Sequence, residues 1–100
     1  MPPPNTVILT VAAEQDLRDI EVYTLQQWGE RQAKRYVFSI EEAIDTVGDN
    51  PKLGRVRPTL SADYRVYIVK SHALVYTVLQ NTVTIVRILH QRMNISQHVA

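Results

Sequence analysis

The spacing of hydrophobic residues changes half-way along this sequence, and that change constrains the fold more than any other feature. In the first half, apolar side chains recur at the three- and four-residue intervals of amphipathic helices. Gly29 interrupts this pattern where a helix would usually end, and the Asn50-Pro51 pair prevents it from continuing. The sequence therefore predicts two helices, over residues 13–28 and 30–47, joined by a short link into an antiparallel hairpin.

Short β-branched runs precede and follow the predicted helices. Residues 6–11 are typical of a strand, and Thr10 can cap the following helix through its hydroxyl group. The polar dipeptides at residues 71–72 and 80–81 are typical of tight turns, so the strands that they join must be antiparallel. The C-terminal strands are predicted over residues 64–70, 73–79 and 83–90.

The expected fold is α+β, with the element order β-α-α-β-β-β. The helical hairpin should pack its apolar stripes on one face of an antiparallel sheet. Residues 49–63 contain several proline and glycine residues and are predicted to form a long loop, residues 91–100 a polar tail, and residues 1–5 a disordered end. We interpret residues 1–100 as one domain, close to the commonest domain size.

Composition excludes several classes of site. The chain has no cysteine, so it contains no disulfide, thiolate metal site or cysteine nucleophile. The three histidines, His72, His90 and His98, lack zinc-ligand spacing, and no Gly-rich phosphate loop is present, so we expect neither a metal nor a cofactor. No apolar run approaches the roughly 18 residues that span a bilayer, and the N-terminus lacks a basic signal region. We therefore expect a cytoplasmic protein with no membrane association.

The net charge of +1 conceals an uneven distribution. Residues 1–50 carry four basic and nine acidic side chains, whereas residues 51–100 carry seven basic and one acidic. One interpretation is a basic face directed at an anionic partner. The other is that acidic helices and basic strands attract each other within the fold.

Several segments, taken in order, resemble the toxins of the ParE family, one branch of the ParE/RelE superfamily. The resemblance spans residues 7–98, and the order and spacing of its parts are more specific than any single part. Its parts are residues 12–20, Gln27-Trp28-Gly29 with Ala33 and Tyr36, residues 50–58, Tyr64-Arg65-Val66, Tyr76, and residues 86–94.

The resemblance implies the toxin of a type II toxin–antitoxin module. ParE-like toxins are described as inhibitors of DNA gyrase, held in a hetero-oligomer by a ParD-like antitoxin whose N-terminal part binds DNA. Sequence-specific DNA binding is therefore not expected of this chain. RelE-like toxins share the fold but cut mRNA on the ribosome, which leaves a ribosome-dependent endonuclease as an alternative. A third possibility is a non-toxic relative that only binds its antitoxin.

An RNA-cleaving site needs a base, an acid and several fixed cations. RelE-like nucleases use Lys and Arg side chains, commonly with a Tyr or His near the C-terminus. No tyrosine follows Tyr76, so this chain departs from that pattern, and we expect an inhibitor with no catalytic residue. If the chain were a nuclease, the candidate catalytic residues would be His90, Arg65, Arg87 and Arg92.

Arg87 and His90 also have structural interpretations. Strand alternation places Arg87 with Val83, Ile85 and Leu89, and His90 on the opposite face, so both can line one site only if the strand bulges or ends early. A buried Arg87 would need a partner, for which Asp16 or Glu14 is suited. A histidine at a strand end is more often hydrogen-bonded than catalytic.

Binding residues are predicted in two groups. Loop arginines can approach carboxylate or phosphate in a bidentate manner, although a solvated loop would have the same composition. Tyr23 and Trp28 are more often core aromatics, although their place at the helix junction also suits an antitoxin groove. The candidate target-binding residues are Arg55, Arg57, Arg65 and Arg92. The candidate antitoxin-binding residues are Leu17, Ile20, Tyr23, Trp28 and Tyr36.

Overall fold

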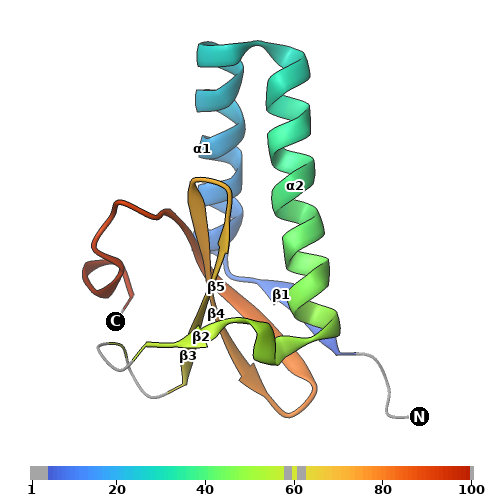
Figure 1. Cartoon of the computed structure of the whole chain (residues 1–100), viewed down its shortest axis with the longest axis vertical. Helices are drawn as coiled ribbons and strands as arrows, with labels where there is room; N and C mark the ends of the chain where they lie inside the picture. Colours follow the sequence, from blue (N-terminus) through green and yellow to red (C-terminus); the bar gives the residue numbers. More distant parts are fainter. Residues whose placement is uncertain (1–4, 58–59, 61–62, 100) are drawn as a thin grey trace.

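A helical hairpin lies on one face of a five-stranded sheet (Figure 1). The computed structural model describes residues 5–57, 60 and 63–99. This arrangement confirms the predicted α+β fold. In order, the elements are β1 (Thr6–Leu9), α1 (Val11–Trp28), α2 (Glu30–Asp49), the 3-10 turn η1 (Pro51–Leu53), β2 (Arg55–Val56), β3 (Tyr64–Val69), β4 (His72–Leu79), β5 (Thr82–His90) and the 3-10 turn η2 (Ile95–Gln97).

The sheet is mixed, which corrects the expectation of a purely antiparallel sheet. Its strand order is β1-β5-β4-β3-β2, and β1 runs parallel to β5. The two strands can be parallel because the helical hairpin forms the long crossover that parallel neighbours require. The strands from β2 to β5 pair antiparallel, as predicted. The short strand β2 lies within residues 49–63, which were expected to be a loop throughout.

Local signals fixed the helix ends almost as predicted. The Thr10 hydroxyl accepts a hydrogen bond from the Ala13 amide at 3.0 Å, and Gly29 ends α1 with a φ of 89°. Gly48 is inside α2 rather than after it, and it is required there because a Cβ would lie 2.5 Å from a Val7 methyl carbon. Neither described helix is apolar enough over sufficient length to cross a bilayer.

The first of the two tight turns differs from prediction by one residue. Lys70 and Ser71 form the first turn, and His72 already belongs to β4. Gln80 and Asn81 form the second turn, as predicted. Lys70 and Gln80 have positive φ angles of 55° and 54°, which suit the primed turns of two-residue hairpins.

Hydrophobic side chains cover both faces of the sheet. The larger cluster lies between the helices and the sheet, and includes Ile40, Leu74, Tyr76 and Ile85. A smaller cluster lies apart from it and includes Val75, Leu89 and Val99. Because Val99 is buried there, the segment expected to be a polar tail packs against the sheet.

The described N-terminal residue, Asn5, is bound to the end of α2. Residues 1–4 of the expected disordered N-terminus lie outside the described residues, as does Ala100. Asn5 is described, and its side-chain amide donates a 2.7 Å hydrogen bond to the Gly48 carbonyl.

One carboxylate joins the first helix to the last strand. Asp16 on α1 accepts hydrogen bonds from the Nε and Nη2 atoms of Arg87 at 2.7 and 2.8 Å, and from the Ile88 amide at 2.9 Å. The two side chains are only 13% and 25% exposed, so water screens this bidentate pair weakly. Its hydrogen bond to Asp16 raises the pKa of Arg87 further above its ordinary value. Asp16 is thus the structural partner that the sequence suggested for Arg87.

A buried hydroxyl fixes the segment that leads into β2. The hydroxyl of Tyr76 donates to the Pro51 carbonyl at 2.7 Å and accepts from the Gly54 amide at 2.8 Å. A Cβ on Gly54 would overlap this hydroxyl, so glycine is required by the close approach. The Arg65 guanidinium completes the arrangement by donating to the Gly54 carbonyl at 2.7 Å. Burial raises the pKa of Tyr76, which keeps its hydroxyl protonated and able to donate.

Replacing Asp16 by asparagine should leave the Arg87 guanidinium half-buried without a counter-charge. We expect the Asp16→Asn protein to lose about 3 kcal/mol of unfolding free energy. Urea denaturation followed by circular dichroism would measure this loss. The control is Asp19→Asn on the same helix, where the carboxylate is exposed, and we expect a change within about 0.5 kcal/mol. Equal stability of the two variants would contradict a structural role for the pair.

Removing the Tyr76 hydroxyl should leave two buried backbone groups without their partner. We expect Tyr76→Phe to lower the free energy of unfolding by about 1–3 kcal/mol, because the Gly54 amide and the Pro51 carbonyl lose a hydrogen bond. Tyr23→Phe removes the same atom from an exposed side chain and should change stability by less than about 0.5 kcal/mol. Thermal denaturation of both variants would show whether the buried hydroxyl contributes.

Candidate functional site

Arg87 and His90 line the same hollow, and both follow a β-bulge in β5. Arg87 pairs with Val75 and Ile85 with Tyr76, so Val86 has no partner on β4. The register with β4 is unbroken from Arg87 to His90, so the bulge does not change their relative faces, and Arg87 instead reaches α1, where it bonds to Asp16. The hollow has a volume of about 220 Å³ and lies between α1 and the end of β5. This edge hollow is also lined by Asp16, Asp19, Ile20, Tyr23, His72, Ile88, Leu89 and Met93.

Two histidines and a tyrosine form a chain of contacts beside the edge hollow. The Tyr36 hydroxyl lies 2.7 Å from Nδ1 of His72, and it accepts a hydrogen bond from the Ser71 amide at 3.1 Å. The rings of His72 and His90 meet edge to face, with centroids 5.3 Å apart. Burial, followed by the nearby charge of His90, lowers the pKa of His72, so the neutral ring is favoured at neutral pH. This contact chain was not foreseen, because it joins residues from α2, β4 and β5.

The four residues named for a nuclease do not form one constellation. Arg87 on β5 is paired with Asp16, and Arg65 on β3 is bound to the Gly54 carbonyl. Strand β4 lies between β5 and β3. The Nδ1 atom of His90 accepts a hydrogen bond from the Arg92 amide at 3.1 Å, which fits the structural interpretation of this histidine. The Arg92 side chain is exposed. Two of the three arginines therefore already have partners within the fold.

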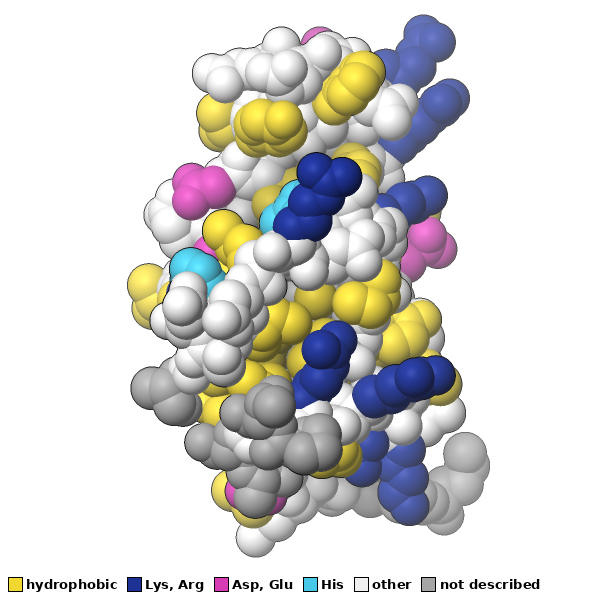
Figure 2. Space-filling model, turned by 60° about the vertical axis from the view of Figure 1, so that its left-hand side comes forward, with side chains coloured by type: hydrophobic (Ala, Val, Ile, Leu, Met, Phe, Trp, Pro, Cys, Tyr) yellow, Lys and Arg dark blue, Asp and Glu magenta, His cyan; other side chains and the backbone are white. Residues whose placement is uncertain are grey.

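The predicted target-binding arginines differ in the exposure and hydrogen bonding of their side chains. Arg55, Arg57 and Arg92 are exposed, whereas Arg65 is half-buried and holds Gly54. Neither of the two ion pairs among the described residues involves any of these four side chains. Figure 2 shows Lys and Arg side chains spread along this side of the molecule, among exposed hydrophobic side chains. Charge that is not used inside the fold is thus available at this surface.

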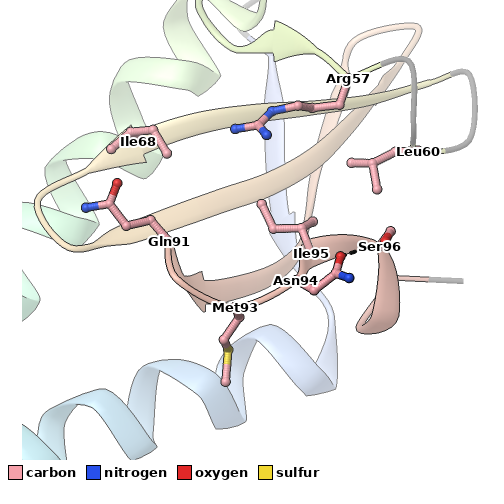
Figure 3. A pocket seen from close by; sticks show the side chains of 8 residues that line it. All are labelled: Arg57, Leu60, Ile68, Gln91, Met93, Asn94, Ile95 and Ser96. Carbon is pink, nitrogen blue, oxygen red and sulfur yellow. Dashed lines mark hydrogen bonds between the residues drawn. The ribbon is translucent and has the colours of Figure 1, made fainter.

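A second hollow, of about 340 Å³, lies between the region of β2 and β3 and the C-terminal segment (Figure 3). We call it the far-face hollow, because the partly buried Ile95 and Leu60 pack with the smaller hydrophobic cluster rather than with the helices. Arg57 extends over the hollow from the β2 side, and Asn94 approaches from the C-terminal segment. Its described lining is Arg57, Leu60, Ile68, Gln91, Met93, Asn94, Ile95 and Ser96.

The candidate antitoxin-binding residues divide into a buried and an exposed group. Leu17, Ile20 and Tyr36 pack in the larger core cluster. Tyr23 and Trp28 are 62% and 71% exposed, so the expectation that they are core aromatics is wrong. The reason is visible in Figure 1, where the hairpin extends past the sheet and its outer turns have no sheet to pack against. Val22, Leu25 and Phe38 are exposed as well.

Sequence reasoning missed the far-face hollow because it treated residues 91–100 as a tail. The spacing of Ile95 and Val99, four residues apart, was the available signal that this segment packs on something. Within residues 5–57, 60 and 63–99, no group of three or more His, Cys, Asp or Glu side chains is arranged to hold a metal ion.

Comparison with known sequences identifies close relatives along most of the chain. A family model described as the ParE toxin of type II toxin–antitoxin systems, parDE, matches residues 7–95. Toxin ParE1 of Mycobacterium tuberculosis is 36% identical over 93 residues, which cover 92% of this chain and 95% of that protein. Toxin ParE1 of Caulobacter vibrioides is 36% identical over 91 residues, with 91% and 94% covered.

Solved structures with a similar fold include two toxin–antitoxin systems. A chain of the chromosomal ParDE system from P. aeruginosa superposes with a TM-score of 0.76 at 20% identity, covering 86% of this chain and 95% of that chain. A chain of the RelBE2 complex from Mycobacterium tuberculosis gives a TM-score of 0.69 at 20% identity, covering 89% and 100%. At this level of identity these likenesses establish the fold alone. The family match over residues 7–95, together with relatives at 36% identity, shows that this chain belongs to the ParE toxin family of type II toxin–antitoxin systems.

Proposed function

We propose that this toxin inhibits DNA gyrase by binding it, and that a ParD-like antitoxin neutralises it in the cytoplasm. The observation that carries this proposal is the ParE family match, which extends over residues 7–95 rather than over a fragment. ParE-like toxins are described as gyrase inhibitors, and the named relatives are ParE1 toxins. The target and the antitoxin are inferences from this membership.

The positions of the polar side chains favour binding over catalysis. Catalysis of RNA cleavage would need a proton shuttle close to several free cations. Here the His90 ring contacts His72 and accepts the Arg92 amide, while Arg87 is held by Asp16. Three of the predicted target-binding residues, Arg55, Arg57 and Arg92, are exposed cations, which can hold an anionic protein surface without any proton transfer. The ribosome-dependent nuclease is therefore the second candidate.

The outer part of the helical hairpin is the proposed antitoxin surface. Tyr23, Trp28 and Phe38 are all at least 60% exposed, although large apolar side chains are usually buried. An amphipathic helix from the antitoxin could place its apolar face over them. Of the five residues predicted from sequence, Tyr23 and Trp28 are the two that offer large exposed surfaces for this contact.

Removing exposed cations should weaken gyrase inhibition more than removing the histidine. We expect the combined change of Arg55, Arg57 and Arg92 to glutamine to raise the inhibitory concentration by about tenfold or more, since each exposed ion pair contributes up to roughly 1 kcal/mol. His90→Gln should change it by less than about threefold, because no proton transfer is required. Gyrase supercoiling with purified toxin would measure both, after circular dichroism has confirmed that each variant is folded.

The same proteins separate the two candidate functions. If wild-type toxin leaves supercoiling intact but cleaves ribosome-bound mRNA, and His90→Gln abolishes that cleavage, the nuclease replaces the gyrase inhibitor. If neither activity is present and the protein still binds its antitoxin, it is the non-toxic relative.

Replacing Trp28 should weaken antitoxin binding without destabilising the toxin. We expect Trp28→Ser to raise the Kd for the ParD-like partner by about tenfold or more, because buried tryptophans commonly dominate interface energies. Leu79→Ser is the matched control, since Leu79 is 75% exposed but lies in the turn region between β4 and β5. Titration calorimetry would measure both affinities. Equal loss of affinity in the two variants would show that the hairpin is not the specific contact.

A further inference from the structure

The far-face hollow presents one cation and no counter-charge. Arg57 is the only charged side chain among its described lining residues, and neither ion pair among the described residues involves it. The described chain from residue 51 onward contains a single acidic residue, Asp63, which does not line the hollow. A ligand that enters the hollow therefore meets positive potential on one wall.

The polar groups opposite Arg57 are oriented by hydrogen bonds within the protein. The Oδ1 atom of Asn94 accepts the Ser96 hydroxyl at 2.7 Å, which leaves the amide nitrogen of Asn94 to donate to a ligand (Figure 3). The amide nitrogen of Gln91 donates to the Lys70 carbonyl at 3.3 Å, which leaves its oxygen to accept. The hollow thus combines a guanidinium, an amide donor and an amide acceptor, a set that matches a carboxylate beside a peptide N–H group.

The apolar part of the lining distinguishes between two classes of anionic ligand. Leu60, Ile68, Met93 and Ile95 are aliphatic or thioether side chains, and none of the eight described lining residues is aromatic. Single-stranded nucleic acids are usually held by bases that stack on aromatic rings. An aliphatic surface next to a guanidinium is better suited to a peptide that alternates acidic and apolar side chains.

Contacts within the protein hold parts of both walls of the hollow. The Tyr76 hydroxyl and the Arg65 guanidinium hold Gly54, three residues before Arg57. The opposite wall is held by the buried side chain of Val99 and by the hydrogen bond from the Gln91 amide to the Ser71 carbonyl. Backbone that is already held in place loses less conformational entropy on binding, so even a small contact can contribute to affinity.

We propose that the far-face hollow binds an extended acidic segment of the target protein. In this complex a carboxylate contacts Arg57 and Asn94, a backbone N–H group donates to Gln91, and a neighbouring apolar side chain packs on Ile68 and Ile95. The proposal rests on the proposed function, in which the toxin acts by binding a protein. It goes further by assigning the target contact to the far-face hollow rather than to all exposed arginines equally.

Reversing the charge at Arg57 tests this assignment in the gyrase assay. We expect Arg57→Glu to raise the inhibitory concentration by about tenfold or more, because a carboxylate would then face a carboxylate. Ser96→Glu places a negative charge on the opposite wall and should have the same effect without altering any arginine. Arg31→Glu, an equal charge reversal at an exposed position on α2, should stay within about twofold of wild type. If Arg57→Glu and Ser96→Glu inhibit as well as Arg31→Glu, the hollow is not the contact, while gyrase inhibition by the wild type would still stand.

A peptide titration tests the hollow independently of gyrase. The probe is the capped hexapeptide Glu-Leu-Glu-Val-Glu-Leu, compared with its glutamine counterpart and with an eight-nucleotide single-stranded RNA. In NMR spectra of the full chain, the acidic peptide should shift the side-chain amide signals of Gln91 and Asn94, and Arg57→Glu should abolish the shift. Binding of the acidic peptide by a toxin that leaves gyrase active would overturn the target but support the hollow. Failure of the acidic peptide to shift these signals, or a shift by the RNA alone, would overturn the proposal.

Discussion

The carboxylate of Asp16 is the interaction on which the rest of this structure depends. It accepts two hydrogen bonds from Arg87 and one from the Ile88 amide, and so fixes α1 against β5. These contacts lie where β1 has ended, since β1 pairs with β5 only as far as Ile85. Without Asp16, the Ile88 amide would face the hydrophobic core or the edge hollow without a partner, which is costly for a backbone group.

Thr10 supports the same junction from the other side of the bulge. Its amide donates to the Ile85 carbonyl and its hydroxyl to the carbonyl of the bulged residue Val86, while the same oxygen caps α1. The start of the first helix is therefore tied to the last strand by side chains separated by more than 70 residues. Such long-range contacts make the arrangement of the two layers a property of the whole chain.

Using polar groups for structure leaves few for chemistry. Arg87 and Arg65 hold the fold together, and His72 and His90 contact each other beside Tyr36. Exposed side chains include Arg55, Arg57 and Arg92, and Tyr23 and Trp28 on the helical hairpin. These are the side chains to which we assign the proposed target and antitoxin contacts.

The sequence by itself determined the order of the main elements, the junction of the two helices at Gly29 and the antiparallel pairing of the C-terminal strands, because spacing, caps and tight turns act over a few residues. It also narrowed the partner of Arg87 to Asp16 or Glu14, since a buried guanidinium requires a carboxylate. Only the tertiary structure decided the parallel pairing of β1, the bulge at Val86 and the packing of Val99 on the sheet. Each of these depends on contacts between distant segments, which leave no regular spacing in the sequence. For the same reason the exposure of Trp28 was misjudged, because its helical position gives no indication that the sheet ends before the hairpin does.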